Sequence, residues 1–152
     1  MDKCQSLTSS VLTDIAEVRR TEKGKIYPKG TVYIQVSACN KNSKDSWMIL
    51  EDPGCLEDKY AVAIPNIDIE PDYFRIALEE ATPEWFARYV GTNINISMDA
   101  FKYFVVRYNE NKEQQAKYVE MIRTVEKEIA LVRESIAANK DIKEWYLSKM
   151  FV

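Results

Sequence analysis

The C-terminal part of the chain carries apolar side chains at alternating steps of four and three residues, up to Asn139. This heptad spacing is typical of a helix that presents a narrow apolar seam to a partner helix. Residues 112–151 contain no proline or glycine, so a helix of roughly 60 Å can form without interruption. We expect a long helix over residues 111–152. Its expected dimerisation seam consists of Tyr118, Ile122, Val125, Ile129, Val132, Ile136, Asn139, Ile142 and Tyr146.

Packing of this helix only on its own domain is disfavoured, because a helix of that length extends well beyond a domain of about 110 residues. A polar residue in such a seam fixes register and orientation, and Asn139 has that place here. The pattern therefore predicts coiled-coil pairing.

The chain before the long helix alternates between strand-like and helix-like patterns. Period-two, β-branched stretches predict strands, and Pro71 fits the first turn of a helix that Glu70 or Asp68 caps. The sequence predicts an α+β domain over residues 1–110. Its expected strands are 16–20, 31–37, 47–50, 60–64 and 103–107; its expected helices are 10–16 (capped by Ser9 or Ser10), 71–81 and 82–90, with a turn at 22–25 and one helical turn at 98–101.

The composition argues against catalysis. The chain has 152 residues, a net charge of −3 and no histidine, which removes the usual general base and the serine–histidine and cysteine–histidine pairs. The three cysteines lack metal-ligand or disulfide spacing, and the acidic residues between Asp45 and Asp58 lack the spacing of a calcium loop. We therefore expect a cytoplasmic, non-catalytic protein with no metal, no cofactor, no signal peptide and no membrane span.

The distribution of charge is uneven. Residues 19–44 hold seven cations against one acid, whereas residues 51–110 hold 5 basic and 12 acidic residues. Cations mixed with amide and hydroxyl side chains are typical of a nucleic-acid contact, although an ordinary soluble surface can also carry them. The candidate DNA-binding residues are Arg19, Arg20, Lys23, Lys25, Lys29, Lys41, Asn42 and Lys44.

Several short motifs also follow one another in a recognisable order. They are LTDIAEVRR (12–20), PKGTVYI (28–34), YAVAIP (60–65), IEPDYF (69–74), GTNINI (91–96), EQQ (113–115), and VEKEI with DIK in the long helix. In this order the chain resembles the specificity subunit of type I restriction–modification systems. The resemblance is to one target recognition domain with its adjoining conserved helix, and it covers nearly the whole chain.

The resemblance implies a half-sized, non-catalytic specificity subunit. Two copies would pair their long helices antiparallel, each domain would contact one half of a bipartite double-stranded DNA site, and a separate methyltransferase that uses S-adenosylmethionine would dock. A motor and nuclease subunit would complete the system. The family usually has tens of residues where this chain has only residues 21–27, and the chain is acidic. An alternative is therefore a protein-interaction module derived from that subunit that no longer reads DNA.

Overall fold

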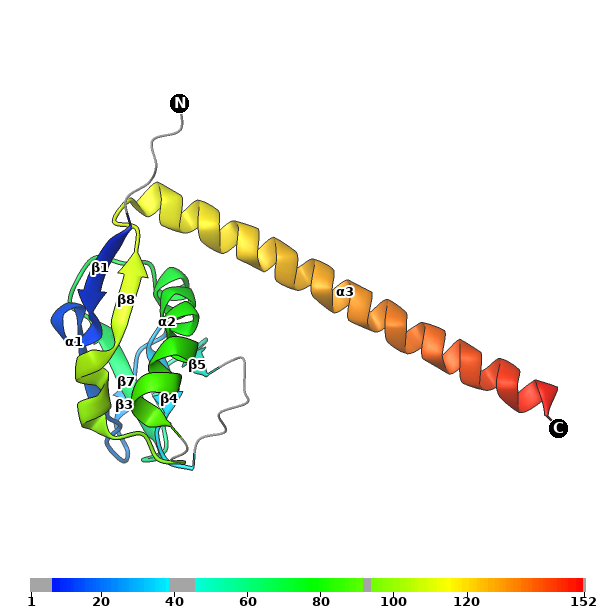
Figure 1. The fold of residues 1–152 in the computed structure, drawn as a ribbon, viewed down its shortest axis with the longest axis horizontal. Coiled ribbons are helices and arrows are strands. Elements are labelled where there is room, and N and C mark those ends of the chain that lie inside the picture. Colours follow the sequence, from blue (N-terminus) through cyan, green and yellow to red (C-terminus); the bar gives the residue numbers. More distant parts are fainter. Residues whose placement is uncertain (1–6, 39–45, 92–93, 152) are drawn as a thin grey trace. The chain divides into compact units, whose positions relative to one another are not determined.

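The computed structural model describes residues 7–38, 46–91 and 94–151. The chain divides into a mixed α/β unit, Met1–Ala116, and a helical unit, Lys117–Val152, which confirms the predicted α+β class with a long C-terminal helix (Figure 1). The elements in chain order are β1 (Thr8–Val11), α1 (Leu12–Ile15), β2 (Ala16–Arg20), β3 (Ile26–Tyr27), β4 (Val32–Gln35), β5 (Trp47–Ile49), β6 (Gly54–Cys55), β7 (Tyr60–Pro65), α2 (Pro71–Trp85), the π-helical turn η1 (Phe86–Val90), the 3₁₀ helix η2 (Met98–Tyr103), β8 (Val105–Tyr108) and α3 (Lys112–Met150).

The largest sheet has four antiparallel strands in the order β2-β7-β4-β5. Ile34 lies opposite both Trp47 and Ala61 in the register, so these three side chains share one face. That face packs on α2, where the buried Trp47 Nε1 donates a hydrogen bond of 2.9 Å to Thr82 Oγ1. On the opposite face, Val62 joins a second cluster with Tyr27. Both faces of the central strands are therefore covered, which explains the continuous apolar run in β7.

Helix α2 departs from the sequence prediction at its C-terminal end. We expected a second helix to begin at Thr82, but α2 continues through Pro83 to Trp85 and then widens into the π-helical turn η1. Thr82 Oγ1 donates to the Leu78 carbonyl (2.7 Å) while it accepts from Trp47. This buried pair of hydrogen bonds keeps the backbone helical where proline alone would favour a break. The helix start at Pro71 with Glu70 as its cap, and the end at Gly91 (φ 59°), are confirmed.

The N-terminal helix is also shorter than predicted. Helix α1 begins at Leu12, and neither Ser9 nor Ser10 caps it, because both residues belong to β1. Strand β1 pairs antiparallel with β8, and Figure 1 shows the two side by side. A partner more than ninety residues away therefore overrides the local capping signal.

The start of α3 is attached to the α/β unit by polar side chains. Asn111 caps the helix, since its Oδ1 accepts the N–H groups of Glu113 (2.9 Å) and Gln114 (3.2 Å). Gln115 is buried; its Oε1 accepts the Glu70 N–H (3.0 Å) and its Nε2 donates to the Asn109 carbonyl (2.7 Å). The EQQ motif thus ties the first turn of α3 to the start of α2 and the end of β8.

Candidate nucleic-acid interface

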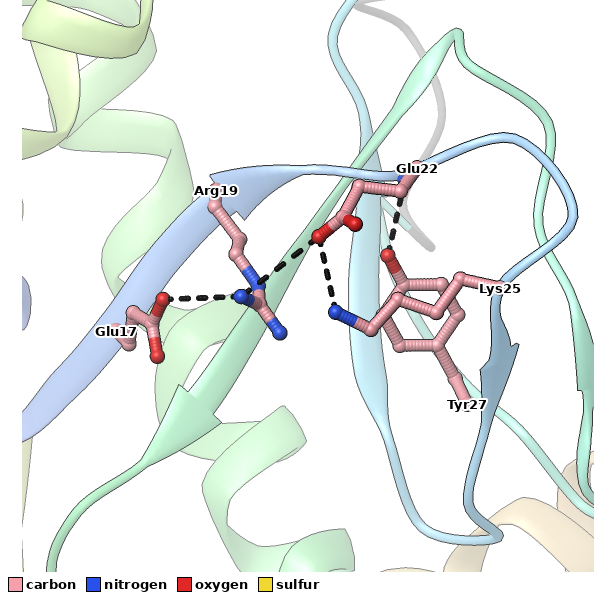
Figure 2. Close-up of polar contacts among 5 residues, drawn as sticks. All are labelled: Glu17, Arg19, Glu22, Lys25 and Tyr27. Carbon is pink, nitrogen blue, oxygen red and sulfur yellow. Dashed lines mark hydrogen bonds and ion pairs between the residues drawn. The ribbon is translucent and has the colours of Figure 1, made fainter.

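The expected DNA-contacting cations begin on β2, where Arg19 already has carboxylate partners. Its Nη1 lies 3.4 Å from Glu17 Oε1 and 3.8 Å from Glu22 Oε1 (Figure 2). Its Nε is buried without a hydrogen-bond partner. A phosphate that contacts Arg19 therefore competes with two carboxylates.

Lys25 is held in the same network, at the turn that follows β2. Its Nζ lies 2.9 Å from Glu22 Oε1 and 5.8 Å from the centre of the Tyr27 ring (Figure 2). The Tyr27 hydroxyl accepts the Glu22 N–H at 3.0 Å. The sequence predicts this turn, and the hydrogen bond from the Lys25 N–H to the Glu22 carbonyl (3.2 Å) with Gly24 at φ 79° confirms it.

The hydrogen bond from Lys25, followed by the positive charge of Lys25, lowers the pKa of the Glu22 carboxyl below its ordinary value of 4.5. The ionised form is favoured in the folded state, so the stability from this contact is present above the unfolded pKa and is lost as the pH falls below about 4.5. We expect Lys25→Met to return the pKa of Glu22 toward 4.5 in an NMR titration of the side-chain carboxyl. The Lys29→Met control should leave it unchanged, and an equal rise in both variants would contradict the assignment.

The remaining described cations are more accessible. Arg20 has only a weak contact, with its Nη1 3.5 Å from Ser37 Oγ. Lys23 and Lys29 are exposed and lie in two turns on either side of β3. Neither lysine forms an ion pair with any described residue. These two lysines are the side chains best placed to meet a phosphate without losing an existing partner. Lys41, Asn42 and Lys44 lie outside the described residues.

An acidic segment lies alongside the basic one. Strands β3 and β6 pair, with Ile26 opposite Cys55 and Tyr27 opposite Gly54. Beside them, Thr21 Oγ1 donates to the Glu57 carbonyl at 2.5 Å. The backbone on both sides of β6 therefore lies beside residues 21–27, and acidic residues in this segment lower the positive potential that residues 19–44 would otherwise have. Sequence reasoning did not find this arrangement, because strands of two residues leave no periodic signal.

The apolar seam of α3 is uncovered in the single chain. Seven of the expected seam residues are between 40% and 58% exposed: Tyr118, Val125, Ile129, Val132, Ile136, Ile142 and Tyr146. Every residue from Arg123 to Phe151 is exposed. The apolar seam of this 39-residue helix is therefore available for packing, which supplies most of the stability of helices in proteins.

Trp47 and Trp85 are buried in the core of the α/β unit. Among the described residues, no three His, Cys, Asp or Glu side chains are grouped so that they could hold a metal ion. In the same part of the chain, no helix is long and apolar enough to cross a membrane.

Comparison with known proteins gives a result at the level of structure only. No family model and no curated protein matches the sequence. Several solved structures match the fold, among them the following three. The S subunit of a type I restriction–modification system from M. genitalium aligns with a TM-score of 0.64 at 12% identity, covering 99% of this chain and 47% of that one.

The HsdS subunit from Thermoanaerobacter tengcongensis aligns with a TM-score of 0.62 at 12% identity, over 89% of this chain and 41% of that one. A third structure comes from work on complex assembly and conformational transition of a type I restriction–modification system. It aligns with a TM-score of 0.68 at 13% identity, over 91% of this chain and 43% of that one. The chain spans less than half of the length of each. The fold of this chain, an α+β unit followed by a long helix, is therefore similar to that of part of the type I restriction–modification S (HsdS) subunits.

Proposed function

We propose that this chain is a DNA-binding half-subunit of a type I restriction–modification system. The observation that carries the proposal is the combination of one domain of this fold with one long helix whose apolar seam is exposed. In this proposal the long helix of a second copy packs against that seam and buries it. The expected domain boundary at residue 110 belongs to this proposal, with the recognition domain before it and the pairing helix after it.

The proposed dimer is antiparallel and has a true twofold axis. Two helices of about 58 Å place the two α/β units at opposite ends of the pair. Each unit contacts one half-site, so the expected target is bipartite and palindromic. The length of α3 sets the separation of the half-sites.

The proposed DNA contacts are unequal. Arg20, Lys23 and Lys29 contact phosphates directly, whereas Arg19 and Lys25 first exchange a carboxylate for a phosphate. Lys41, Asn42 and Lys44 belong to the same proposed surface. The chain performs no chemistry of its own, and a methyltransferase subunit docks on the assembled dimer.

The alternative function is a protein-interaction module that pairs through α3 but does not read DNA. The ion pairs of Arg19 and Lys25 and the acidic segment beside β3 favour this alternative. The two proposals differ in their dependence on salt. Phosphate contacts release counterions and weaken steeply as salt rises, whereas an apolar helix contact changes little.

Light scattering with and without a random-sequence duplex, at low and moderate salt, tests both. The half-subunit predicts a mass near twice the chain mass of 17.7 kDa. Addition of duplex at low salt should increase this mass, and higher salt should restore the mass of the dimer alone. A dimer that ignores duplex at every salt supports the interaction module. A monomer without any shift contradicts both.

Neutralising two lysines should reduce the salt dependence of DNA binding. The Lys23→Gln/Lys29→Gln variant removes two cations, so the slope of log K against log salt should fall by about 1.8 per domain, at about 0.9 per phosphate. The matched control is Lys140→Gln/Lys143→Gln, which removes two exposed lysines from α3. Equal changes in the two variants would place the DNA contact elsewhere.

A further inference from the structure

The heptad spacing of α3 continues beyond the apolar part of the seam and passes through two polar residues. Figure 1 shows α3 as one continuous helix, so the spacing that begins at Tyr118 can be followed to the C-terminal end. After Ile136 the same spacing reaches Asn139, Lys143, Tyr146 and Met150. The core positions of the heptad are therefore apolar up to Ile136, polar at the next two positions and apolar again at the end.

Lys143 favours an antiparallel pair of helices over a parallel one. In a parallel pair each core residue lies opposite its own copy, so two Lys143 ammonium groups would face each other within an apolar contact, where an unpaired charge is costly. In an antiparallel pair Lys143 lies opposite a different residue. Lys143 is exposed and forms no ion pair with any described residue, so it can take a new partner.

Three antiparallel registers bring long parts of two such seams together, and each differs from the next by a shift of seven residues. Ile122 lies opposite Val132 of the second copy in the first register, opposite Asn139 in the second and opposite Tyr146 in the third. The first and second registers bury the same apolar residues between Tyr118 and Ile136. Apolar burial therefore does not choose between these two, and the residues at the edges of the contact do.

The first register brings like charges together. Glu126 and Glu128 are exposed and lie beside core positions, one at each edge of the contact. In an antiparallel pair each edge position meets the same kind of edge position of the second copy. In the first register Glu126 therefore meets Glu126 of the second copy, and Glu128 meets Glu128. Repulsion between carboxylates at both edges disfavours this register.

The second register makes one of these edges complementary. Glu126 meets Arg133 of the second copy, and Glu128 meets the uncharged Ser135. Glu126 and Arg133 are exposed, and neither forms an ion pair with any described residue. The twofold axis generates the pair of Glu126 and Arg133 twice. Two ion pairs therefore replace the repulsion of the first register.

Two further contacts belong to the second register. Lys143 lies opposite Tyr118, which is 40% exposed, and a tyrosine ring accepts an ammonium group in a cation–π contact. At the edge of the seam, Met121 meets Ile142 of the second copy. Met121 and Ile142 are 65% and 53% exposed in the single chain, and in this register they cover each other.

The third register fails at two of the same residues. Lys143 lies opposite Val125, which offers no partner for its ammonium group. Arg133 meets Arg133 of the second copy at the edge, which again juxtaposes like charges. The contact between Glu126 and Lys140 is complementary in this register but removes neither cost. The second register is therefore the one that places every charged residue near the seam beside a suitable or neutral neighbour.

We propose that a second copy of this chain packs antiparallel on α3 in the second register, with the twofold axis between Ala130 and Leu131, and that Glu126, Arg133 and Lys143 select this register. The inference rests on the proposed pairing of α3 and does not depend on DNA binding. A single register gives the proposed half-sites a single separation.

Disulfide formation between two chains that differ in size through a tag reads the register directly. The background carries Cys4→Ser, Cys39→Ser and Cys55→Ser. Chains with Ile122→Cys are mixed with chains that carry Val132→Cys, Asn139→Cys or Tyr146→Cys, one for each register, and are oxidised mildly. We expect the mixture with Asn139→Cys to form the crosslinked dimer at least about tenfold faster than the other two, because a disulfide requires its two Cβ atoms to lie close together.

The other outcomes separate the register from the pairing itself. Faster crosslinking of Val132→Cys or Tyr146→Cys would overturn the register while the antiparallel pair remains. Crosslinking of Ile122→Cys to its own copy would show a parallel pair and would also overturn it. If light scattering finds the unaltered chain to be a monomer, the proposed pairing of α3 fails and the register fails with it.

Charge reversal in the chain with its native cysteines gives a second, independent measurement. Arg133→Glu brings two carboxylates together twice in each dimer, so it should weaken the dimer about fivefold or more. Addition of Glu126→Arg restores opposite charges and should recover most of the affinity. The matched control is Glu128→Arg, which meets Ser135 and should change the affinity by less than about twofold. In sedimentation equilibrium, a double variant that does not recover, or a dimer that Glu128→Arg strengthens, would overturn the proposed register.

Discussion

Ile129→Asp is expected to convert a dimer of this chain into a monomer. Ile129 lies near the middle of the seam between Tyr118 and Tyr146, so an antiparallel partner covers it in any register in which the two seams overlap substantially. In a symmetric dimer the substitution is present in both copies, so two isoleucine contacts are lost. Burial of one isoleucine contributes about 1.5–3 kcal/mol, so the loss of two such contacts weakens the dimer by at least about 100-fold.

The matched control is Leu131→Asp. Leu131 lies on the same helix and is also exposed in the single chain, but its position in the heptad is outside the seam. Sedimentation equilibrium of both variants over a dilution series separates the two positions. A dimer that survives Ile129→Asp and dissociates with Leu131→Asp would show that another face of α3 makes the contact.

Strong periodic patterns predicted their elements from the sequence. The period-two run of β4, the apolar run of β7 and the proline-free stretch of α3 were located within a few residues. The short strands β1, β3 and β6 were missed. Strand β1 has four residues and the other two have two each, so pairing with a distant strand, and not a hydrophobic pattern of their own, determines their conformation. Pro83 was interpreted as a helix boundary, whereas buried contacts of Thr82 keep the helix continuous.

The candidate site was predictable only as a list of residue types. The sequence showed the excess of cations in residues 19–44, but not that Glu17 and Glu22 hold Arg19. Such partners are set by side-chain directions on a strand and across a turn, and hydrophobic periodicity carries no information on them.

Gln115→Ala is expected to destabilise the α/β unit by about 2–4 kcal/mol. The side chain is 1% exposed and satisfies two backbone groups at once, the Glu70 N–H and the Asn109 carbonyl. Alanine leaves both groups buried without partners, at about 1–3 kcal/mol each. Glu70 also caps α2, since its Oε2 accepts the Tyr73 N–H at 2.7 Å, so the start of α2 should loosen together with the start of α3.

Gln114→Ala is the matched control, because it removes the same side chain one position earlier. Only the backbone N–H of Gln114 takes part in the cap of α3 by Asn111, and alanine retains that group. Urea unfolding followed by tryptophan fluorescence reports on the α/β unit through the buried Trp47 and Trp85. Gln115→Ala should lower the midpoint while Gln114→Ala leaves it nearly unchanged. If both variants unfold at the same urea concentration, the attachment of α3 rests on the Asn111 cap and not on Gln115. If only Gln115→Ala is destabilised, Gln115 of the EQQ motif is the polar link between the first turn of α3 and the rest of the α/β unit.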